Sequence, residues 1–175
     1  MNIEKALELI RTIPDYPKPG VIFKDITPML ANGEALHEIT KALAAFASPT
    51  ACIAGIEARG FIFASTIASH LHRGFIPIRK SGKLPFRTHS QSYALEYGEA
   101  VVEIHIDAIK SGQEVLLVDD VLATGGTMCA AIELIGACGG IVTDVATVIE
   151  IPSLGGRDRI SSAYPVISIH SLMSS

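Results

Sequence analysis

The sequence predicts an α/β fold in which a central, mostly parallel sheet is flanked by helices. Short apolar runs rich in β-branched residues, such as residues 52–56 and 115–118, are typical of strands that are buried on both faces. Segments between them, such as residues 36–46 and 61–71, carry apolar residues at helical spacing. This alternation favours parallel strands joined by right-handed helical crossovers, and 175 residues are enough for one domain with a buried core.

The remaining segments are assigned by the same two patterns and by the positions of proline and glycine. Residues 14–28 contain four prolines and a glycine, which argue against an extended helix. Residues 80–98 combine glycine, proline and polar residues with weak periodicity, so we expect a long loop. We further expect a short helix at residues 3–10, a half-exposed antiparallel strand at 99–105, strands at 74–78, 141–151 and 166–169, and a turn with a short helix at 155–160.

Composition and charge exclude several classes of function. A hydrophobic fraction of 49% is typical of a globular protein, and a net charge of −4 argues against nucleic acid or an anionic membrane as the main partner. The chain shows no signal-peptide pattern and no apolar run of membrane-spanning length, so we expect a cytoplasmic protein. The three cysteines (Cys52, Cys129 and Cys138) and the six histidines lack metal-ligand spacing, so we expect reduced cysteines and histidines with packing or surface roles.

The strongest functional signal is a pair of acids followed by a glycine-rich loop. Asp119 and Asp120 follow the apolar run at residues 115–118, at the carboxyl end of a strand, where open α/β sheets bind ligands. The loop at residues 123–127 then supplies two glycines, two threonines and the start of a helical pattern, which together suit a phosphate. Acids ahead of the glycines differ from both a Walker loop and a dinucleotide fingerprint, and they suit the hydroxyls of a sugar phosphate. An ordinary turn with capping threonines is the alternative.

Positive charge is concentrated between Glu57 and Glu96, a stretch that contains no acid. Its basic residues are Arg59, Arg73, Arg79, Lys80, Lys83 and Arg87. Arg59 follows one predicted strand, while Arg79, Lys80 and Lys83 follow the next, so both groups can meet at the edge of the sheet that carries the phosphate loop. A polyanion such as pyrophosphate would explain this concentration, and a solvated basic surface is the alternative.

Four segments resemble, in order, motifs of the adenine phosphoribosyltransferases, which are type I phosphoribosyltransferases. They are residues 15–28, 57–60, 79–85 and 119–127, and the resemblance extends over residues 15–156. It implies the type I phosphoribosyltransferase fold as a single domain over residues 1–175. The family's hood would comprise about residues 1–30 and parts of 151–175, and its mobile lid loop would comprise residues 80–98. This chain departs from the family's Asp-Ser-Arg-Gly at Glu57 and Ala58, and we predict a cis peptide bond between these two residues.

The resemblance implies a purine-salvage enzyme that converts adenine and 5-phosphoribosyl-1-pyrophosphate (PRPP) into AMP and pyrophosphate. Mg²⁺ would be bound mainly through PRPP and water, and the protein would be a homodimer in which Lys80 could reach the neighbouring site. Another phosphoribosyltransferase, for example one for xanthine, is the first alternative. A non-catalytic PRPP-sensing regulator is the second, but the chain has no room for a DNA-binding module.

The resemblance also implies roles for individual residues. Ribose and its 5′-phosphate would be bound by Asp119, Asp120, Ala123, Thr124, Gly125, Gly126 and Thr127. Pyrophosphate would be bound by Arg59, Arg79, Lys80 and Lys83, of which Arg59 and Lys83 would also act in catalysis. Adenine would stack on Phe23, meet the backbone of Ile22 and Lys24, and pack against Ile151. Glu96 would be the catalytic acid–base and Tyr97 a lid residue. On residue type alone, Phe23 could instead fill the core and Glu96 could solvate the end of a loop.

Overall fold

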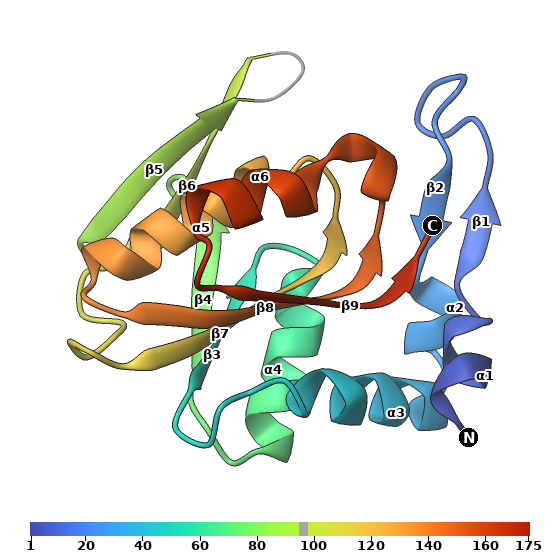
Figure 1. The fold of residues 1–175 in the computed structure, drawn as a ribbon, viewed down its shortest axis with the longest axis horizontal. Helices are drawn as coiled ribbons and strands as arrows, with labels where there is room; N and C mark the ends of the chain where they lie inside the picture. The colour runs from blue at the N-terminus through green and yellow to red at the C-terminus, as the bar shows by residue number, and fades with distance from the viewer. Residues whose placement is uncertain (95–97) are drawn as a thin grey trace. The chain divides into compact units, whose positions relative to one another are not determined.

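The computed structural model describes residues 1–94 and 98–175, which divide into two compact units, Met1–Ala42 and Leu43–Ser175. The described elements of the first unit are α1 (Ile3–Leu7), the antiparallel pair β1 (Arg11–Ile13) and β2 (Phe23–Asp25), α2 (Thr27–Leu30) and most of α3 (Gly33–Ala44) (Figure 1). The first helix is shorter than predicted: Asn2 caps it by accepting a hydrogen bond from the Lys5 N–H at 3.0 Å, and it ends at Leu7.

The proline-rich segment of the first unit is more ordered than a loop. The sequence places Phe23 in a loop, but Phe23 begins β2, where its Cα pairs with that of Ile13. Asp25 at the end of β2 accepts a hydrogen bond from Arg11 Nη2 at 2.6 Å and another from the Thr27 N–H at 2.9 Å. These contacts join β1, β2 and the start of α2, and the pairing of Arg11 with Asp25 links residues too far apart in sequence to give a periodic signal.

The described residues of the second unit form a seven-stranded, mostly parallel sheet, as the sequence predicts. Its spatial order is β5-β6-β4-β3-β7-β8-β9, and the antiparallel pairs are β4 with β6 and β5 with β6. The strands are β3 (Cys52–Ile56), β4 (Phe75–Lys80), β5 (Thr88–Ala94), β6 (Glu99–His105), β7 (Glu114–Leu122), β8 (Ile141–Glu150) and β9 (Ser168–Ser174). Figure 1 shows α4 (Gly60–His70) on one face and α5 (Gly126–Ala137) with α6 (Gly156–Ala163) on the other.

The core of this unit lies on both faces of β3 and β7. Ala54 and Leu117 belong to one buried cluster with Ile135 of α5. The alternate residues Ile53 and Leu116 are also fully buried, and they point to the face that α4 covers. This explains why the sequence shows these strands as continuous apolar runs rather than as alternating ones.

β7 and β5 differ from the sequence prediction in ways that affect the site. β7 continues to Leu122 because β8 pairs with it that far, so Asp119 and Asp120 lie within the strand and not beyond its end. β5 occupies seven residues of the stretch at 80–98 that the sequence predicts to be a loop. Its residues are mostly polar and carry little apolar alternation, but they pair along their whole length with β6.

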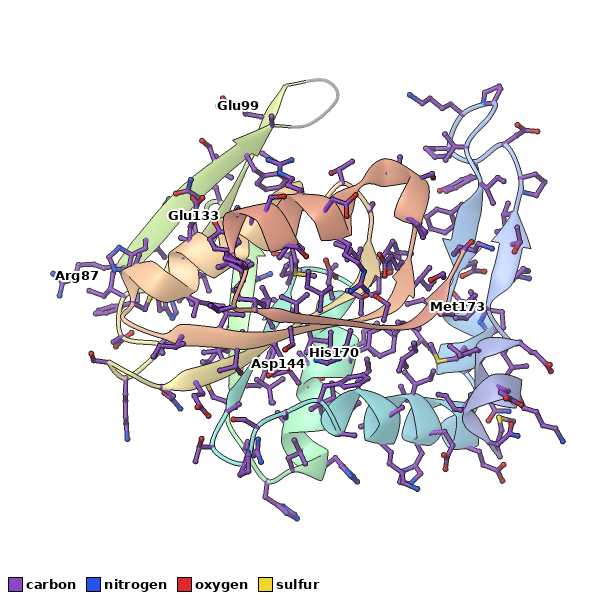
Figure 2. All side chains as sticks on the ribbon, viewed as in Figure 1. Arg87, Glu99, Glu133, Asp144, His170 and Met173 are labelled. Atoms are coloured by element: carbon purple, nitrogen blue, oxygen red, sulfur yellow. The ribbon has the colours of Figure 1, made fainter. Side chains whose placement is uncertain are left out.

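β9, the outermost strand beside β8, begins and ends later than the predicted strand at residues 166–169. His170 of β9 lies beside Asp144 of β8 with 2.8 Å between Nε2 and Oδ1, and its ring stacks on Phe46 at 4.1 Å between centroids (Figure 2). This histidine has the packing role that the sequence predicts. Among the described residues, no helix combines the length and the apolar composition needed to cross a membrane.

Candidate active site

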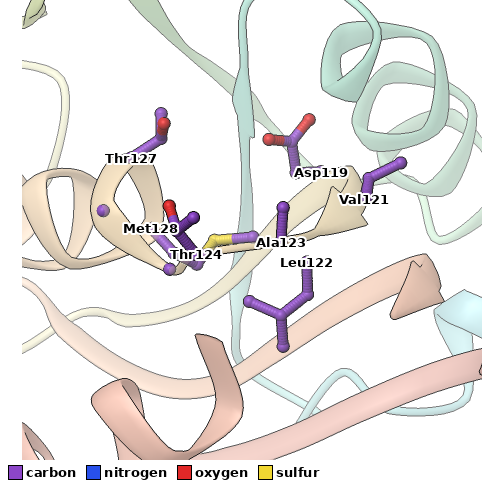
Figure 3. A pocket seen from close by; sticks show the side chains of 9 residues that line it. Asp119, Val121, Leu122, Ala123, Thr124, Thr127 and Met128 are labelled. Carbon is purple, nitrogen blue, oxygen red and sulfur yellow. The ribbon is translucent and has the colours of Figure 1, made fainter. Parts of the chain in front are cut away.

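A hollow lies where β7 ends and α5 begins. Its lining is formed by Asp119, Val121, Leu122, Ala123, Thr124, Gly125, Gly126, Thr127 and Met128 (Figure 3). The first N–H groups of α5 have no partner within the helix, and the helix dipole adds positive potential at this end. The hollow therefore combines backbone donors, two threonine hydroxyls and one carboxylate, the groups that a phosphorylated sugar requires.

Two glycines allow the loop before α5 to take its path. Gly125 has φ +76°, a conformation that favours glycine, and a Cβ on it would lie 2.9 Å from the carbonyl oxygen of Gly156. Gly156 in turn has no room for a side chain, because a Cβ there would lie 2.2 Å from the carbonyl oxygen of Ala123. The turn before α6 thus supports the phosphate loop from behind. Sequence reasoning missed this support, although the adjacent Gly155 and Gly156 were a signal for it.

The turn before α6 is fixed to the sheet by Arg157. Its Nε donates to Glu150 Oε1 at 2.8 Å, and its Nη1 donates to the carbonyl oxygen of Ile169 at 2.9 Å. The Arg157 hydrogen bond is also the main reason why the pKa of Glu150 is lowered. Arg157 therefore joins β8, β9 and the turn that supports the phosphate loop, a role that sequence reasoning did not assign.

The two acids of β7 point in opposite directions and have different partners. Asp119 lines the hollow, whereas Asp120 is 5% exposed and forms an ion pair with Arg59, with 2.8 Å between Nε and Oδ2. Burial and the charge of Asp120 raise the pKa of Asp119. Burial also raises the pKa of Asp120, and the Arg59 charge opposes that increase. The structure thus places Asp119 at the hollow and places Asp120 against Arg59.

The loop at residues 57–60 packs against these acids. A Cβ on Gly60 would lie 2.8 Å from Asp119 Oδ1 and 2.9 Å from the carbonyl oxygen of Val118, so only glycine fits. The predicted cis peptide bond between Glu57 and Ala58 is confirmed. The loop at residues 57–60 and the acids of β7, which are about 60 residues apart in the sequence, therefore meet at the carboxyl ends of the parallel strands β3 and β7. The sequence predicts this meeting.

The cationic stretch is not unopposed, which corrects the sequence interpretation. Glu57 Oε1 accepts a hydrogen bond from Lys83 Nζ at 2.7 Å, and Oε2 accepts from Arg79 Nε at 3.2 Å and from the Lys80 N–H at 3.0 Å. Burial favours the neutral acid, but the hydrogen bonds from Lys83, Lys80 and Arg79 outweigh it and lower the pKa of Glu57 to about 2. The acid that begins the stretch thus neutralises part of its positive charge.

Not all of the basic residues between Glu57 and Glu96 lie at the carboxyl ends of the strands, near the hollow. Arg73 Nη1 donates to the carbonyl oxygens of Ser48 and Ala51 at 2.7 and 2.9 Å, before the start of β3. The guanidinium of Arg87 lies over the ring of its neighbour Phe86, 5.6 Å from the centroid. Arg59, Arg79, Lys80 and Lys83 therefore form the cationic group near the hollow, and we name these four residues the cationic rim.

Glu103 is a further buried acid that sequence reasoning took for an ordinary strand residue. It accepts hydrogen bonds from Ser81 Oγ at 2.7 Å, from the Gly82 N–H at 3.1 Å and from Ser90 Oγ at 3.3 Å. The Ser81 hydrogen bond is the main cause of its lowered pKa. Glu103 thereby fixes the turn that carries Lys83 onto β5 and β6.

The residues that the resemblance assigns to adenine lie in separate parts of the chain. In the first unit, Phe23 is half-buried and meets the ring of Tyr16 edge-on at 5.1 Å between centroids, while Ile22 is 62% exposed. Lys24 Nζ donates to Thr12 Oγ1 at 3.1 Å. In the second unit, the Ile151 N–H donates to the carbonyl oxygen of Leu122 at 2.9 Å. Glu96 and Tyr97 lie outside the described residues.

Comparison with known proteins identifies the family. Residues 27–170 match the model of the phosphoribosyl transferase domain. An adenine phosphoribosyltransferase of Symbiobacterium thermophilum is 52% identical over 162 residues, which cover 91% of this chain and 95% of that one. A relative of that name from Thermobifida fusca is 52% identical over 154 residues, covering 87% and 88%.

Solved structures agree with this assignment. The adenine phosphoribosyltransferase of Thermoanaerobacter pseudethanolicus has a TM-score of 0.92 at 43% identity, and the match covers 99% of this chain and 100% of that one. The Giardia lamblia enzyme, solved with 9-deazaadenine, has a TM-score of 0.91 at 35% identity, with 100% and 98% covered. The chain therefore belongs to the phosphoribosyltransferase family, and within it to the adenine phosphoribosyltransferases.

Proposed function

We infer that this chain transfers the 5-phosphoribosyl group of PRPP to adenine and forms AMP and pyrophosphate, a reaction of purine salvage. The observation that carries this inference is the hollow at the start of α5, where the phosphate loop, Asp119 and the loop at residues 57–60 meet. The preference for adenine is supported by the relatives, which are adenine phosphoribosyltransferases at about half identity over most of the chain.

We propose that the 5′-phosphate is anchored by the backbone N–H groups of residues 123–127 and by the hydroxyls of Thr124 and Thr127. This anchor lies away from the bond that breaks, so its binding energy serves to orient the ribose. Asp119 is placed to accept hydrogen bonds from ribose hydroxyls in the same hollow. Asp120 contributes to this site by its ion pair with Arg59, which orients the guanidinium.

The proposed reaction breaks the bond between ribose C1 and a pyrophosphate oxygen. The electron pair leaves with the oxygen, the ribose ring becomes positively charged, and adenine N9 forms the new bond to C1. The cationic rim is placed to stabilise the departing pyrophosphate, and the carboxylate of Asp119 favours the cationic ring. N9 loses a proton in this step, and we propose Glu96 as the group that accepts it.

Mg²⁺ fits this site as a partner of PRPP. The ion prefers oxygen ligands and usually retains waters beside one or two carboxylates and substrate phosphates. Asp119 offers a carboxylate at the hollow, and it would hold the hydrated ion there together with the ribose and the diphosphate. When it is bound, Mg²⁺ supplies charge that neutralises the leaving pyrophosphate.

For the base, we propose that adenine stacks on Phe23, forms hydrogen bonds with the backbone of Ile22 and Lys24, and packs against Ile151. Residues 1–30 and parts of 151–175 would act as the hood of a single catalytic domain. Residues 80–98, which include β5, would act as the lid that excludes water from PRPP, and Tyr97 would be a lid residue.

The assembly and the cellular location are also proposals. We propose a homodimer in which Lys80 reaches the active site of the other subunit, because its side chain is exposed at the carboxyl end of β4. Sedimentation analysis should give twice the mass of the 18.5 kDa chain, and a monomer at all concentrations would contradict this. The free thiols of Cys52, Cys129 and Cys138 fit a reducing compartment, and we therefore propose the cytoplasm.

Pyrophosphate release measured with PRPP and each nucleobase in turn tests the function. We expect release with adenine at a kcat/KM at least about 100-fold above that with xanthine, hypoxanthine or guanine, since a mispaired buried polar edge is costly. Release with xanthine alone would favour the first alternative, and PRPP binding without release with any base would favour the regulator. A crystal structure with AMP should place its phosphate against residues 123–127; any other position contradicts the proposed site.

A further inference from the structure

Glu57 lies at the centre of the cationic rim, where its carboxylate is the common partner of two side chains and one main-chain group. Lys83 Nζ lies 2.7 Å from Oε1, Arg79 Nε lies 3.2 Å from Oε2, and Arg79 Nη2 lies 3.4 Å from Oε1. Arg79 Nη1 also donates to the carbonyl oxygen of Lys83 at 3.0 Å, which closes the turn over the acid. Two of the four cations that the proposed function assigns to pyrophosphate, Arg79 and Lys83, are therefore already bound to the Glu57 carboxylate.

The acid and its cationic partners differ in how firmly they are held. The Glu57 side chain is 9% exposed, its carboxylate accepts the Lys80 N–H at 3.0 Å, and its own N–H donates to the carbonyl oxygen of Ile78 at 2.9 Å. The side chains of Arg79 and Lys83 are 32% and 48% exposed. Long, exposed side chains can swing out to another anion, whereas the buried acid stays in place with a main-chain partner.

We propose that Glu57 is an internal counter-ion of the pyrophosphate site, which holds Arg79 and Lys83 together when no diphosphate is bound and yields them when it binds. The proposal rests on the proposed function, in which these two cations bind pyrophosphate. Because its pKa is lowered to about 2, Glu57 is ionised at neutral pH. A diphosphate carries several charges against its single charge, so the ammonium and guanidinium favour the diphosphate.

The exchange has a cost and a benefit. Glu57 competes with pyrophosphate for the same cations and so weakens the affinity of the site for both PRPP and the product. In return, it prevents two like charges from repelling each other in the free protein, and it keeps them close to their bound positions. A product that binds less tightly leaves sooner, which favours turnover if pyrophosphate release limits the rate.

The test is a double-mutant cycle measured by titration calorimetry with pyrophosphate and Mg²⁺. The variants are Glu57→Gln, Lys83→Met and both together; glutamine retains an acceptor for the Lys80 N–H but loses the charge. We expect Glu57→Gln to lower the Kd for pyrophosphate roughly three- to tenfold, as the loss of a partly exposed competing ion pair predicts. In the Lys83→Met background this gain should be smaller, because Glu57 then competes with pyrophosphate for Arg79 alone.

Controls separate exchange from simple repulsion and from misfolding. Glu133→Gln removes the same charge from the exposed face of α5, where Glu133 accepts a hydrogen bond from the Tyr164 hydroxyl, and it should change the Kd less than twofold (Figure 2). Circular dichroism and thermal melts establish that each variant is folded. AMP affinity should be unchanged in Glu57→Gln, since AMP lacks the diphosphate.

Each other outcome overturns the proposal in a distinguishable way. If Glu57→Gln weakens pyrophosphate binding or leaves it unchanged, Glu57 is an anchor and not a competitor. If the gain is equal in the Lys83→Met background, the effect is long-range repulsion. If Lys83→Met alone leaves the Kd unchanged, the assignment of Lys83 to pyrophosphate is wrong, and the proposed function fails at this residue together with the counter-ion role.

Discussion

At the scale of single residues, the site depends on charges and glycines whose partners are distant in the sequence. Glu57 begins the acid-free stretch, yet its partner Arg79 lies near the end of β4 and its partner Lys83 lies in the turn beyond β4. Gly60 has no Cβ because Asp119 occupies the space. The residue types at such positions can be read from the sequence, but the pairing cannot, because it depends on the register of β3 against β4 and β7.

Glu57 also predicts how stability depends on pH. A carboxyl whose pKa is lowered from 4.5 to about 2 by folding contributes stability that is fully present above 4.5 and is lost as pH falls through 2. Glu57→Gln should therefore reduce the free energy of unfolding at pH 7 by about 1–2 kcal/mol, after allowance for the exposed partners, and should flatten its decline between pH 4.5 and 2. Urea unfolding across this range measures both; equal slopes for the two proteins would contradict the ion-pair geometry.

At the scale of elements, the apolar pattern of the sequence predicts those strands and helices that are stabilised mainly by burial of apolar side chains. The runs that became β3, β7 and α4 were visible because these elements bury continuous apolar surface. β5 was not visible, because its residues are mostly polar, although it pairs with β6 along its whole length. The extension of β7 through Asp119 was missed for a related reason: pairing with β8 continues where the apolar run stops.

The turn between β8 and α6 supplies an element-scale prediction. Gly156→Ala would place a methyl group 2.2 Å from the carbonyl oxygen of Ala123 and 3.0 Å from the nitrogen of Gly125, so the phosphate loop must shift. We expect kcat/KM for PRPP to fall roughly 10- to 100-fold, because misplacement of an anchored substrate costs orientation. Initial-rate measurements with PRPP varied at saturating adenine give this value.

A matched control for that change lies in α5. Gly136→Ala meets no heavy atom within 4 Å, and alanine stabilises a helix interior by about 0.5–1 kcal/mol relative to glycine. This variant should melt higher and keep its kcat/KM. If Gly156→Ala also kept its kcat/KM, support of the phosphate loop by the turn before α6 would be disproved.

At the scale of the whole molecule, the arrangement of charge should affect PRPP, a polyanion, but not adenine, which is neutral. The chain has a net charge of −4, yet its sheet edge at the hollow carries the cationic rim. A cationic site on an acidic protein draws a polyanion by a local field that salt screens over about 10 Å at 0.1 M. Adenine is neutral, so the same field has no effect on its approach.

Substitution of Lys80 tests this local field most directly. Its side chain is exposed, and the hydrogen bond to Glu57 comes from its main-chain N–H, which a substitution retains. We expect Lys80→Gln to lower kcat/KM for PRPP roughly five- to tenfold at low salt, to make that value less sensitive to added KCl, and to leave the KM for adenine within twofold. Lys110→Gln removes an equal charge from the turn before β7, at the opposite edge of the sheet, where the side chain is also exposed. Equal loss in the two variants would mean that PRPP senses only net charge, whereas loss confined to Lys80→Gln locates the attraction at the edge that carries the phosphate loop.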